Sequence, residues 1–265
     1  MASRFQSAQA WLQLASLQSG QRDAPGALSS LEKARALAPS SEEVLHVYSQ
    51  AALAAGAPLT AIPALESLTR IVPTVGEYQR LLGAALVRAG DTAAALDPLR
   101  EAVRLEPDRL DTLVALGGAL DDRKLYPEAK PHLVRAQSLA PDDAAVLAEL
   151  AVAEEGLGET QQAEAHARRA LERSAGDATA SLVLGSIALE SERYPEARDA
   201  LLAALAAAPS STKAHYQLSL VYARLGDEAS ARANLLAYRR ETQEAEGRLA
   251  KVRALTGFSP GGMQP

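Results

Sequence analysis

A period of 34 residues governs the sequence, and the prolines show it most plainly. Five of the 14 prolines occupy positions 39, 73, 107, 141 and 209, so each gap in this series is 34 residues except the last, which is 68. Ala175 stands where the missing proline would fall. A second series with the same spacing consists of alanines at positions 27, 61, 95, 129, 163, 197 and 231. A third consists of Leu14, Tyr48, Leu82, Leu116, Leu150, Leu184 and Leu218. Three independent series with one period indicate an array of structural repeats.

Each series has a physical role in a pair of helices. Proline lacks a backbone N–H and pushes the residue before it out of the α region, so it ends a helix. The alanines fall early in the second helix of each pair, where a larger side chain would hold the first helix away. The leucine series lies on the face of the first helix that packs against the second. Neither helix can bury its apolar stripe alone, so neighbouring pairs must stack. The sequence therefore predicts an all-α solenoid of antiparallel helix pairs.

The composition agrees with helices and excludes several functions. Hydrophobic residues make up 48% of the chain but aromatic residues only 4%. The apolar share is therefore mostly alanine and leucine, which are strong helix formers. A net charge of −6 and a pI near 5.4 argue against nucleic-acid binding, which needs a concentrated basic face. The chain has no cysteine, which excludes disulfides and thiolate chemistry.

The sequence also bears on location. No stretch reaches the ~18 consecutive apolar residues that span a membrane, and residues 1–7 lack the apolar core of a secretory signal. We therefore expect a soluble chain without a membrane span. Its compartment is left open between the cytoplasm and, if a signal upstream of Met1 has been removed, the periplasm.

The order of residue types within each period resembles that of the tetratricopeptide repeat (TPR) family. The third repeat shows the pattern as Leu82, Gly83, Leu86, Gly90, Asp91, Ala95, Leu99, Ala102 and Pro107. The fourth shows it as Leu116, Gly117, Leu120, Ala129, Leu133, Ala136 and Pro141. The sixth shows it as Leu184, Gly185, Ala197, Leu201, Ala204 and Pro209. The resemblance covers roughly residues 8–245. It implies a right-handed α-solenoid, a TPR superhelix, that binds other proteins and catalyses no reaction.

The period also predicts the boundaries. After a lead-in of residues 1–7, the seven repeats are expected at 8–41, 42–75, 76–109, 110–143, 144–177, 178–211 and 212–245. Apolar residues continue at steps of three and four beyond the last repeat, so its second helix should extend through 246–256. We favour a cap on the open end of the solenoid for this extension, with a coiled-coil seam to a second copy as the alternative. A monomer is accordingly expected over a homodimer. Residues 257–265 are expected to form a disordered tail.

No catalytic or cofactor-binding motif is found. Residues 116–120 lack the spacing of a phosphate-binding loop, and Gly185 followed by Ser186 lacks the second glycine of a nucleophile elbow. We therefore expect no catalytic residue, no cofactor and no metal. His132 and His166 lie one period apart, but two histidines without nearby carboxylates are weak support for a metal site. We expect both on the exposed convex face.

The resemblance implies that a partner binds on the concave surface, which is lined by the first helix of each pair. The family's positions, transferred to this sequence, are His46, Gln50, Arg80, Ala84, Val87, Arg88, Val114, Gly118, Asp121, Asp122, Ala148, Val152, Glu155, Leu182, Ser186, Leu189, Glu190 and Tyr216, together with Gln9, Leu12, Ser16, Asp111, Lys213 and Arg224. Small and apolar residues in its middle suit an extended peptide or a helix of a protein partner.

Two further features bear on the partner. Family members that bind chaperone C-terminal carboxylates use lysine and asparagine pairs on successive first helices. The only asparagine here, Asn234, falls in a second helix, so this ligand is not expected. The remaining alternative is a regulatory or accessory module that serves an enzyme or a bacterial envelope assembly system.

Acidic residues recur near the C-terminal ends of three successive first helices. They are Asp121, Asp122, Glu154, Glu155, Glu190 and Glu192. Negative charge at such ends opposes the helix dipole by roughly 0.3–1 kcal/mol per site, so its recurrence points to a partner segment with basic residues. The other interpretation is that Arg123, Lys124 and Arg193 neutralise the charge and the face is merely solvated. The fifth repeat departs most from the pattern, because Glu154 replaces a large apolar residue and Ala175 replaces proline.

Overall fold

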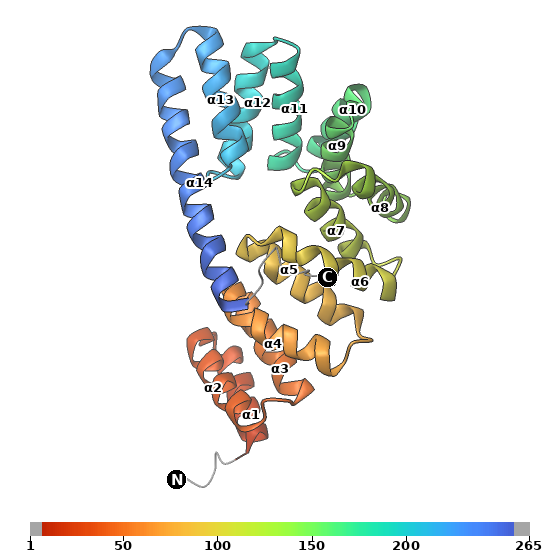
Figure 1. Ribbon diagram of the computed structural model, residues 1–265, viewed down its shortest axis with the longest axis vertical. Helices are drawn as coiled ribbons and strands as arrows, with labels where there is room; N and C mark the ends of the chain where they lie inside the picture. The colour runs from red at the N-terminus through yellow and green to blue at the C-terminus, as the bar shows by residue number, and fades with distance from the viewer. Residues whose placement is uncertain (1–6, 257–265) are drawn as a thin grey trace, which may run out of the picture. The chain divides into compact units, whose positions relative to one another are not determined.

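The computed structural model describes residues 7–256, and the elements within them are α-helices without strands. They are α1 (Ala8–Gly20), α2 (Ala24–Leu37), α3 (Glu42–Ala54), α4 (Pro58–Ile71), α5 (Gly76–Ala89), α6 (Thr92–Leu105), α7 (Leu110–Asp122), α8 (Tyr126–Leu139), α9 (Ala144–Gly156), α10 (Thr160–Arg173), α11 (Ala178–Glu190), α12 (Tyr194–Ala207), α13 (Thr212–Leu225) and α14 (Glu228–Thr256) (Figure 1). The prediction of an all-α chain is confirmed. The expected disordered tail at 257–265, and all but the last residue of the lead-in, lie outside the described residues.

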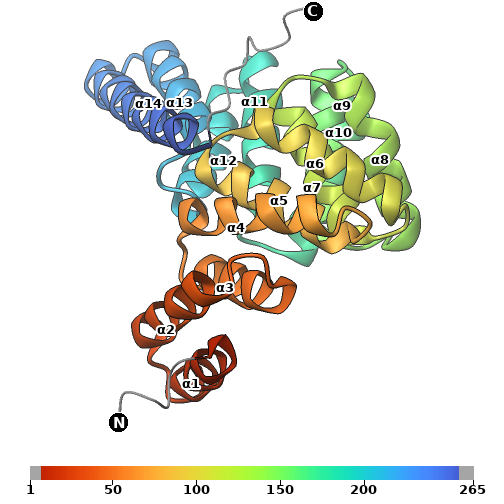
Figure 2. The same cartoon turned by 60° about the horizontal axis from the view of Figure 1, so that its bottom comes forward.

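Consecutive helices pair as hairpins, from α1 with α2 through α11 with α12, as both views of the ribbon show (Figures 1 and 2). The seventh pair is joined by the rings of Tyr216 on α13 and Tyr238 on α14, whose centroids lie 5.3 Å apart. The hairpins belong to two compact units. The first contains α1–α6 and residues 249–256 of α14, and the second contains residues 108–248. Tandem hairpins of this kind are the fold class of an α-solenoid.

The helices end where the proline series predicts. The helices α2, α4, α6, α8 and α12 each stop two residues before one of its prolines. The helix α10 ends at Arg173, two residues before Ala175, although no proline is present. Asp177 then begins α11, because its Oδ1 accepts a hydrogen bond of 2.8 Å from the backbone N–H of Ala180. Side-chain caps of the same kind begin α3, α9 and α13, so the boundary between repeats does not depend on proline alone.

Small residues let the two helices of a hairpin approach closely. The alanines at positions 27, 61, 95, 129, 163 and 197 are at most 2% exposed. Gly83, Gly117 and Gly185 lie against leucines of the second helix. A Cβ added to Gly185 would come within 2.6 Å of Leu201 Cγ. At these three positions the backbone itself forms part of the interface.

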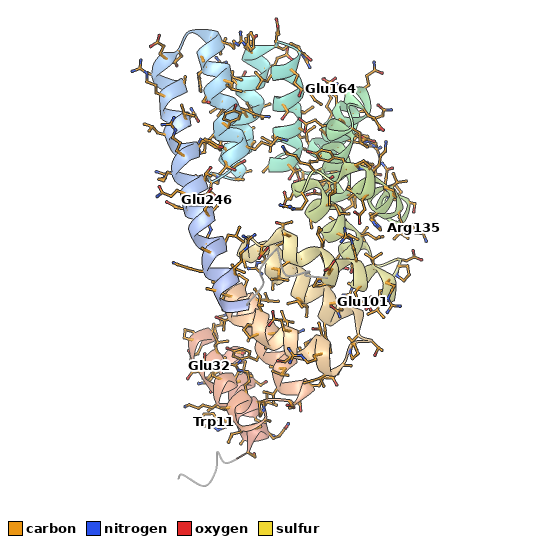
Figure 3. All side chains as sticks on the ribbon, in the orientation of Figure 1. Trp11, Glu32, Glu101, Arg135, Glu164 and Glu246 are labelled. Atoms are coloured by element: carbon orange, nitrogen blue, oxygen red, sulfur yellow. The ribbon has the colours of Figure 1, made fainter. Side chains whose placement is uncertain are left out.

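Ion pairs tie second helices of the second unit to loops between helices. Arg135 on α8 lies 2.7 Å from Asp108, and Glu164 on α10 lies 3.4 Å from Arg193, which precedes α12 (Arg135 and Glu164 are labelled in Figure 3). These pairs are partly or largely exposed, so each contributes at most about 1 kcal/mol. The buried alanine and leucine contacts therefore dominate the stability of the stack.

The end of α14 packs within the chain. Val252 is 0% exposed, and Arg253 Nε lies 3.6 Å from Asp91 Oδ2. Asp91 is also the N-cap of α6, where its Oδ1 accepts from the backbone N–H of Ala94 at 3.2 Å. The apolar stripe that the sequence shows beyond residue 245 thus contributes Val252 to the core of the first unit.

Candidate partner-binding face

In the second unit, the first helices of successive hairpins form one continuous layer. The helix α7 packs against α9, α9 against α11, and α11 against α13. Side chains link the layer as well, because Gln217 Nε2 donates to Ser186 Oγ at 2.6 Å and Lys213 Nζ donates to Glu155 Oε2 at 3.3 Å. We call the side of α7, α9, α11 and α13 that faces away from their second helices the first-helix face.

A cavity of about 280 Å³ opens on this face. Its walls are formed by Gly118, Asp121, Asp122, Lys124, Tyr126, Glu149, Val152, Thr179, Leu182, Val183 and Lys213. Three of these side chains, those of Asp121, Asp122 and Glu149, carry carboxyl groups, and the apolar ones come mainly from α9 and α11. We call this cavity the acidic pocket. All of its residues belong to the second unit.

Asp121 is the most unusual residue of the acidic pocket. Its side chain is 5% exposed, and neither carboxylate oxygen has a hydrogen-bond partner. Burial raises its pKa from the ordinary value of 3.8 to about 8, the negative charges of Glu149 and Asp122 add to the rise, and Lys213 opposes it. Buried polar atoms in proteins are nearly always paired. This carboxyl group is therefore an exception that needs an explanation.

Glu149 is the second carboxyl group of the pocket with a shifted pKa. Burial raises its pKa from 4.5 to about 7, and the charges of Asp122 and Asp177 act in the same direction. Gly118 makes room for it, since a Cβ at position 118 would lie 3.0 Å from Glu149 Oε2. The absence of a side chain on α7 thus lets a carboxyl group of α9 lie directly against it.

The acidic pocket gathers five of the residues that the sequence predicts for the concave surface. They are Gly118, Asp121, Asp122, Val152 and Leu182, and the expected Lys213 joins them. Elsewhere on the first-helix face, Val114, Glu155 and Leu189 are half-buried, and Glu190 is exposed. Tyr216 is 45% exposed, whereas Ala148 and Ser186 are buried beneath the surface.

The predicted residues of the first unit have a different environment. His46 packs edge-on against Tyr78 at 5.2 Å between ring centroids. Arg80 pairs with Glu77 of its own helix at 2.6 Å, and Arg88 donates to the backbone carbonyl of Leu53 at 3.3 Å. Ala84 and Val87 are half-buried, and Gln50 is exposed. A mainly apolar cavity of about 410 Å³ lies between α1 and α3, and the predicted Gln9, Leu12 and Ser16 are in its walls.

Two acidic residues do not behave as the sequence suggests. Glu149, which the family's positions miss, lies in the pocket. Its spacing of three residues from Val152 would have placed it on the same side of α9. Glu154 lies elsewhere: it is 3% exposed, and its Oε2 is 2.7 Å from His166 Nδ1. It therefore belongs to the packing between α9 and α10 rather than to an acidic surface.

The histidine prediction is corrected by the same contact. His166 is only half-buried rather than exposed, and its second ring nitrogen, Nε2, lies 2.9 Å from Gln137 Nε2. His132 is likewise half-buried.

Within residues 7–256, no group of three or more histidine, aspartate or glutamate side chains could hold a metal ion. In the same range, no helix combines the length and apolar character required to cross a bilayer.

Comparison with known proteins agrees with the repeat architecture. The profile of the tetratricopeptide repeat family matches residues 49–111 and 182–246. No curated protein matches the sequence. A solved tetratricopeptide repeat protein from Parabacteroides merdae ATCC 43184 is similar over 96% of this chain and 100% of its own, with a TM-score of 0.74 and 12% identity.

Two smaller solved structures are similar over part of the chain. MamA protein matches 62% of this chain and 90% of its own, with a TM-score of 0.58 and 23% identity. YrrB, described as a TPR protein with an unusual peptide-binding site, matches 66% of this chain and 90% of its own, with a TM-score of 0.58 and 19% identity. At these identities the likeness concerns the fold. Taken with the 34-residue period and the helical hairpins, these matches show two tetratricopeptide repeat segments within an array that has the tandem-hairpin fold of that family.

Proposed function

We propose that the chain is a non-catalytic scaffold that binds an extended peptide or a helix of a partner protein on its first-helix face. The observation that carries this proposal is the acidic pocket, a cavity on a continuous layer of first helices. One of its carboxyl groups, that of Asp121, is buried and has no hydrogen-bond partner among residues 7–256. Half-buried apolar residues surround the pocket, so a segment lying there would bury apolar surface as well as meet charge. A peptide-binding site is also named for the similar YrrB protein.

The charges on this face favour a partner segment with basic residues. Asp121, Asp122 and Glu149 line the pocket, and the half-buried Glu155 lies near its edge. Lys213 already pairs with Glu155, and it forms no hydrogen bond with Asp121. Complementary charge would speed encounter with a basic segment and reject acidic ones.

The proposed contact residues are those of the concave surface that the sequence predicts. In the second unit they are Val114, Gly118, Asp121, Asp122, Ala148, Val152, Glu155, Leu182, Ser186, Leu189, Glu190 and Tyr216. Further proposed contact residues lie on α3 and α5 of the first unit, outside the first-helix face as defined: His46, Gln50, Arg80, Ala84, Val87 and Arg88. Buried members such as Ala148 and Ser186 would act by shaping the surface rather than by touching the partner. The scaffold is proposed to act as a monomer.

Selection of short random peptides displayed on phage tests the proposal. The full chain should enrich a set of related peptides, and each enriched peptide should bind at least about tenfold more weakly to Leu182→Trp, which fills the pocket with a bulky ring. The matched control is Leu202→Trp on α12, because Leu202 is 43% exposed on a second helix.

Binding would be measured by fluorescence anisotropy of the labelled peptides, after circular dichroism has shown that both variants are folded. Failure of the wild-type chain to enrich any peptide would contradict the proposal. So would peptides that bind Leu182→Trp as tightly as the wild type.

A further inference from the structure

Resting on the proposed function, we propose that the acidic pocket receives one arginine side chain of the partner segment, with Asp121 as the carboxylate partner of its guanidinium group. The proposal concerns the second unit alone, because the residues of the pocket all lie within 108–248. It specifies which chemical group anchors the partner and where.

The first argument is that Asp121 is buried without hydrogen bonds when no ligand is bound. A carboxyl group that is 5% exposed, with both oxygens unpaired, has lost its hydration without gaining hydrogen bonds. Such a group lowers the free energy of unfolding of the chain. Asp121 also lines the acidic pocket, so a donor bound in the pocket would lie beside its carboxyl group. A ligand that supplies N–H groups would make the pairing that the chain lacks.

The second argument is that the nearest lysines do not satisfy this group. The ammonium of Lys213 bonds to Glu155 at 3.3 Å, and 48% of its side chain is exposed. Lys213 lowers the pKa of Asp121 only against a larger opposing effect of burial. Lys124 lies in the turn after α7 and also lines the pocket, yet neither lysine forms a hydrogen bond with Asp121.

The third argument distinguishes a guanidinium group from other cations. No set of three ligands for a metal ion occurs within the described residues 7–256. A carboxylate with two free oxygens matches the forked donors of arginine, which form two parallel hydrogen bonds, whereas an ammonium group acts as a point charge. Val152, Leu182 and Val183 provide apolar wall for the methylene stem of the side chain.

The fourth argument is the aromatic wall of the pocket. Tyr126, at the start of α8, packs against Gly156 of α9, where a Cβ would collide with its ring. Burial raises the pKa of Tyr126, as do the charges of Glu155 and Asp121. The ring thus lies near the same carboxylates. Guanidinium groups are favoured beside both carboxylates and aromatic rings.

Occupation of the pocket would be coupled to proton release. The charged and titratable groups that face it are Asp121 and Asp122 of α7, Lys124, Tyr126 of α8, Glu149 and Glu155 of α9, Asp177 before α11 and Lys213 of α13. Without a ligand, Asp121 and Glu149 hold protons near neutral pH, because their pKa values are about 8 and about 7. An arginine favours their ionised forms, so affinity should rise with pH between roughly 6 and 8.

Titration of the full chain with N-acetyl-L-arginine amide, followed by NMR, tests the proposal. The expected dissociation constant is on the order of 1 mM, with resonance shifts at residues of the pocket. N-acetyl-L-citrulline amide has the same shape without the charge and should bind at least about tenfold more weakly. Calorimetry at pH 7 in two buffers of different ionisation enthalpy should show release of about one proton.

Two variants complete the test. Asp121→Asn should weaken binding of the arginine amide at least about tenfold and remove much of its pH dependence. Glu172→Gln on α10 makes the same change of charge outside the pocket and should bind like the wild type. The proposal is overturned if the citrulline and arginine amides bind equally, or if Asp121→Asn binds the arginine amide as tightly as the wild type.

The outcome is separable from that of the proposed function. Enriched peptides that bind the face without a conserved arginine would leave the scaffold function standing and refute the arginine pocket. If the chain binds the arginine amide but enriches no peptide, the arginine pocket is supported and the scaffold function is refuted. The lysine analogue, N-acetyl-L-lysine amide, should bind more weakly than the arginine amide, and the opposite order would also refute the choice of guanidinium.

Discussion

The carboxyl group of Asp121 is ionised in the unfolded chain at neutral pH but holds a proton in the folded chain, because burial disfavours its charge. Folding therefore takes up a proton at this position, and the folded state loses stability as the pH rises. Residues that bind ligands often carry such a cost, since the pairing that would offset it comes only with the ligand. Asparagine has nearly the same shape and no charge to desolvate.

We predict that Asp121→Asn is more stable than the wild type at pH 8, by about 1–3 kcal/mol. The folded pKa of about 8 lies above the ordinary 3.8, so the contribution of Asp121 to stability is greatest below pH 4 and is lost as the pH rises toward 8. The difference between the two proteins should therefore be small near pH 4 and grow with pH. Urea unfolding at pH 4.5, 6 and 8 measures it, and a variant that is no more stable than the wild type at pH 8 would contradict the prediction.

A second prediction concerns the pair of Glu154 and His166. Glu154 is 3% exposed, and its hydrogen bond with His166 at 2.7 Å compensates for burial, with Lys130 Nζ 4.0 Å away. His166→Ala should lower the free energy of unfolding by about 2–4 kcal/mol, because it leaves a buried carboxylate poorly paired.

The double variant Glu154→Leu with His166→Ala should recover most of this loss, since leucine restores the apolar residue usual at this position of the repeat. Chemical unfolding of the three proteins measures the recovery. A double variant as unstable as His166→Ala alone would show that the pair contributes more than compensation for burial.

These residues also show how far the sequence predicts a site. Asp121 was predicted because it occupies a family position on the first helix. Glu149 was not, because its carboxyl group reaches the pocket only through the space left by Gly118 on another helix. The sequence places Glu154 with the acidic surface, because sequence position alone does not reveal that His166 lies opposite. Contacts between side chains of different helices are what a repeat period leaves undetermined.

Among the helices, the boundaries follow local chemistry and were predictable. Proline ends most second helices, and Asp177 begins α11 where proline is missing. The spacing of helix to helix within a hairpin was also predictable, from the alanine series. The path of α14 was predictable only in part. The spacing of its apolar residues by three and four predicts its length, but the residues against which Val252 packs come from a distant part of the chain.

At the scale of the helix pair, glycine has opposite effects at two positions, and this gives a third prediction. Gly185→Ala should destabilise the chain by about 1–3 kcal/mol, because the new Cβ would come within 2.6 Å of Leu201 Cγ. Gly247→Ala should stabilise the chain by up to about 1 kcal/mol. A Cβ added at this position would meet no neighbouring atom of the described residues within 4 Å, and alanine favours the helical conformation of α14.

The two substitutions are chemically identical, so each serves as the control for the other. Thermal unfolding followed by circular dichroism should shift the midpoint downward for Gly185→Ala and upward for Gly247→Ala. Equal shifts in one direction would show that helix propensity, rather than close packing, governs both positions.

For the whole molecule, the two units set how stability is distributed. Each unit is a stack in which a hairpin contacts its neighbours, so local losses should remain local. The first unit differs in one respect, since it includes residues 249–256 from the far end of the sequence. Its core is therefore not made of consecutive hairpins alone.

A fourth prediction follows for Val252. Val252→Asp should lower the free energy of unfolding by about 2–4 kcal/mol, because it introduces a carboxylate at a position that is 0% exposed. Ala250→Asp, two residues earlier at an exposed position of α14, should have little effect. Hydrogen exchange should show the loss of protection mainly in the first unit, and size-exclusion chromatography with light scattering should report a monomer for all three proteins. Loss of protection confined to residues 108–248 would contradict this account.

The place of Val252 has a consequence for synthesis of the protein. The ribosome releases residues up to 107 long before residue 249 is made. The first hairpins must therefore wait, partly complete, while the second unit emerges and folds. During that interval the apolar surface that Val252 later covers is open to water and to other chains. The N-terminal half is consequently where binding by chaperones, or aggregation of stalled and truncated chains, should concentrate.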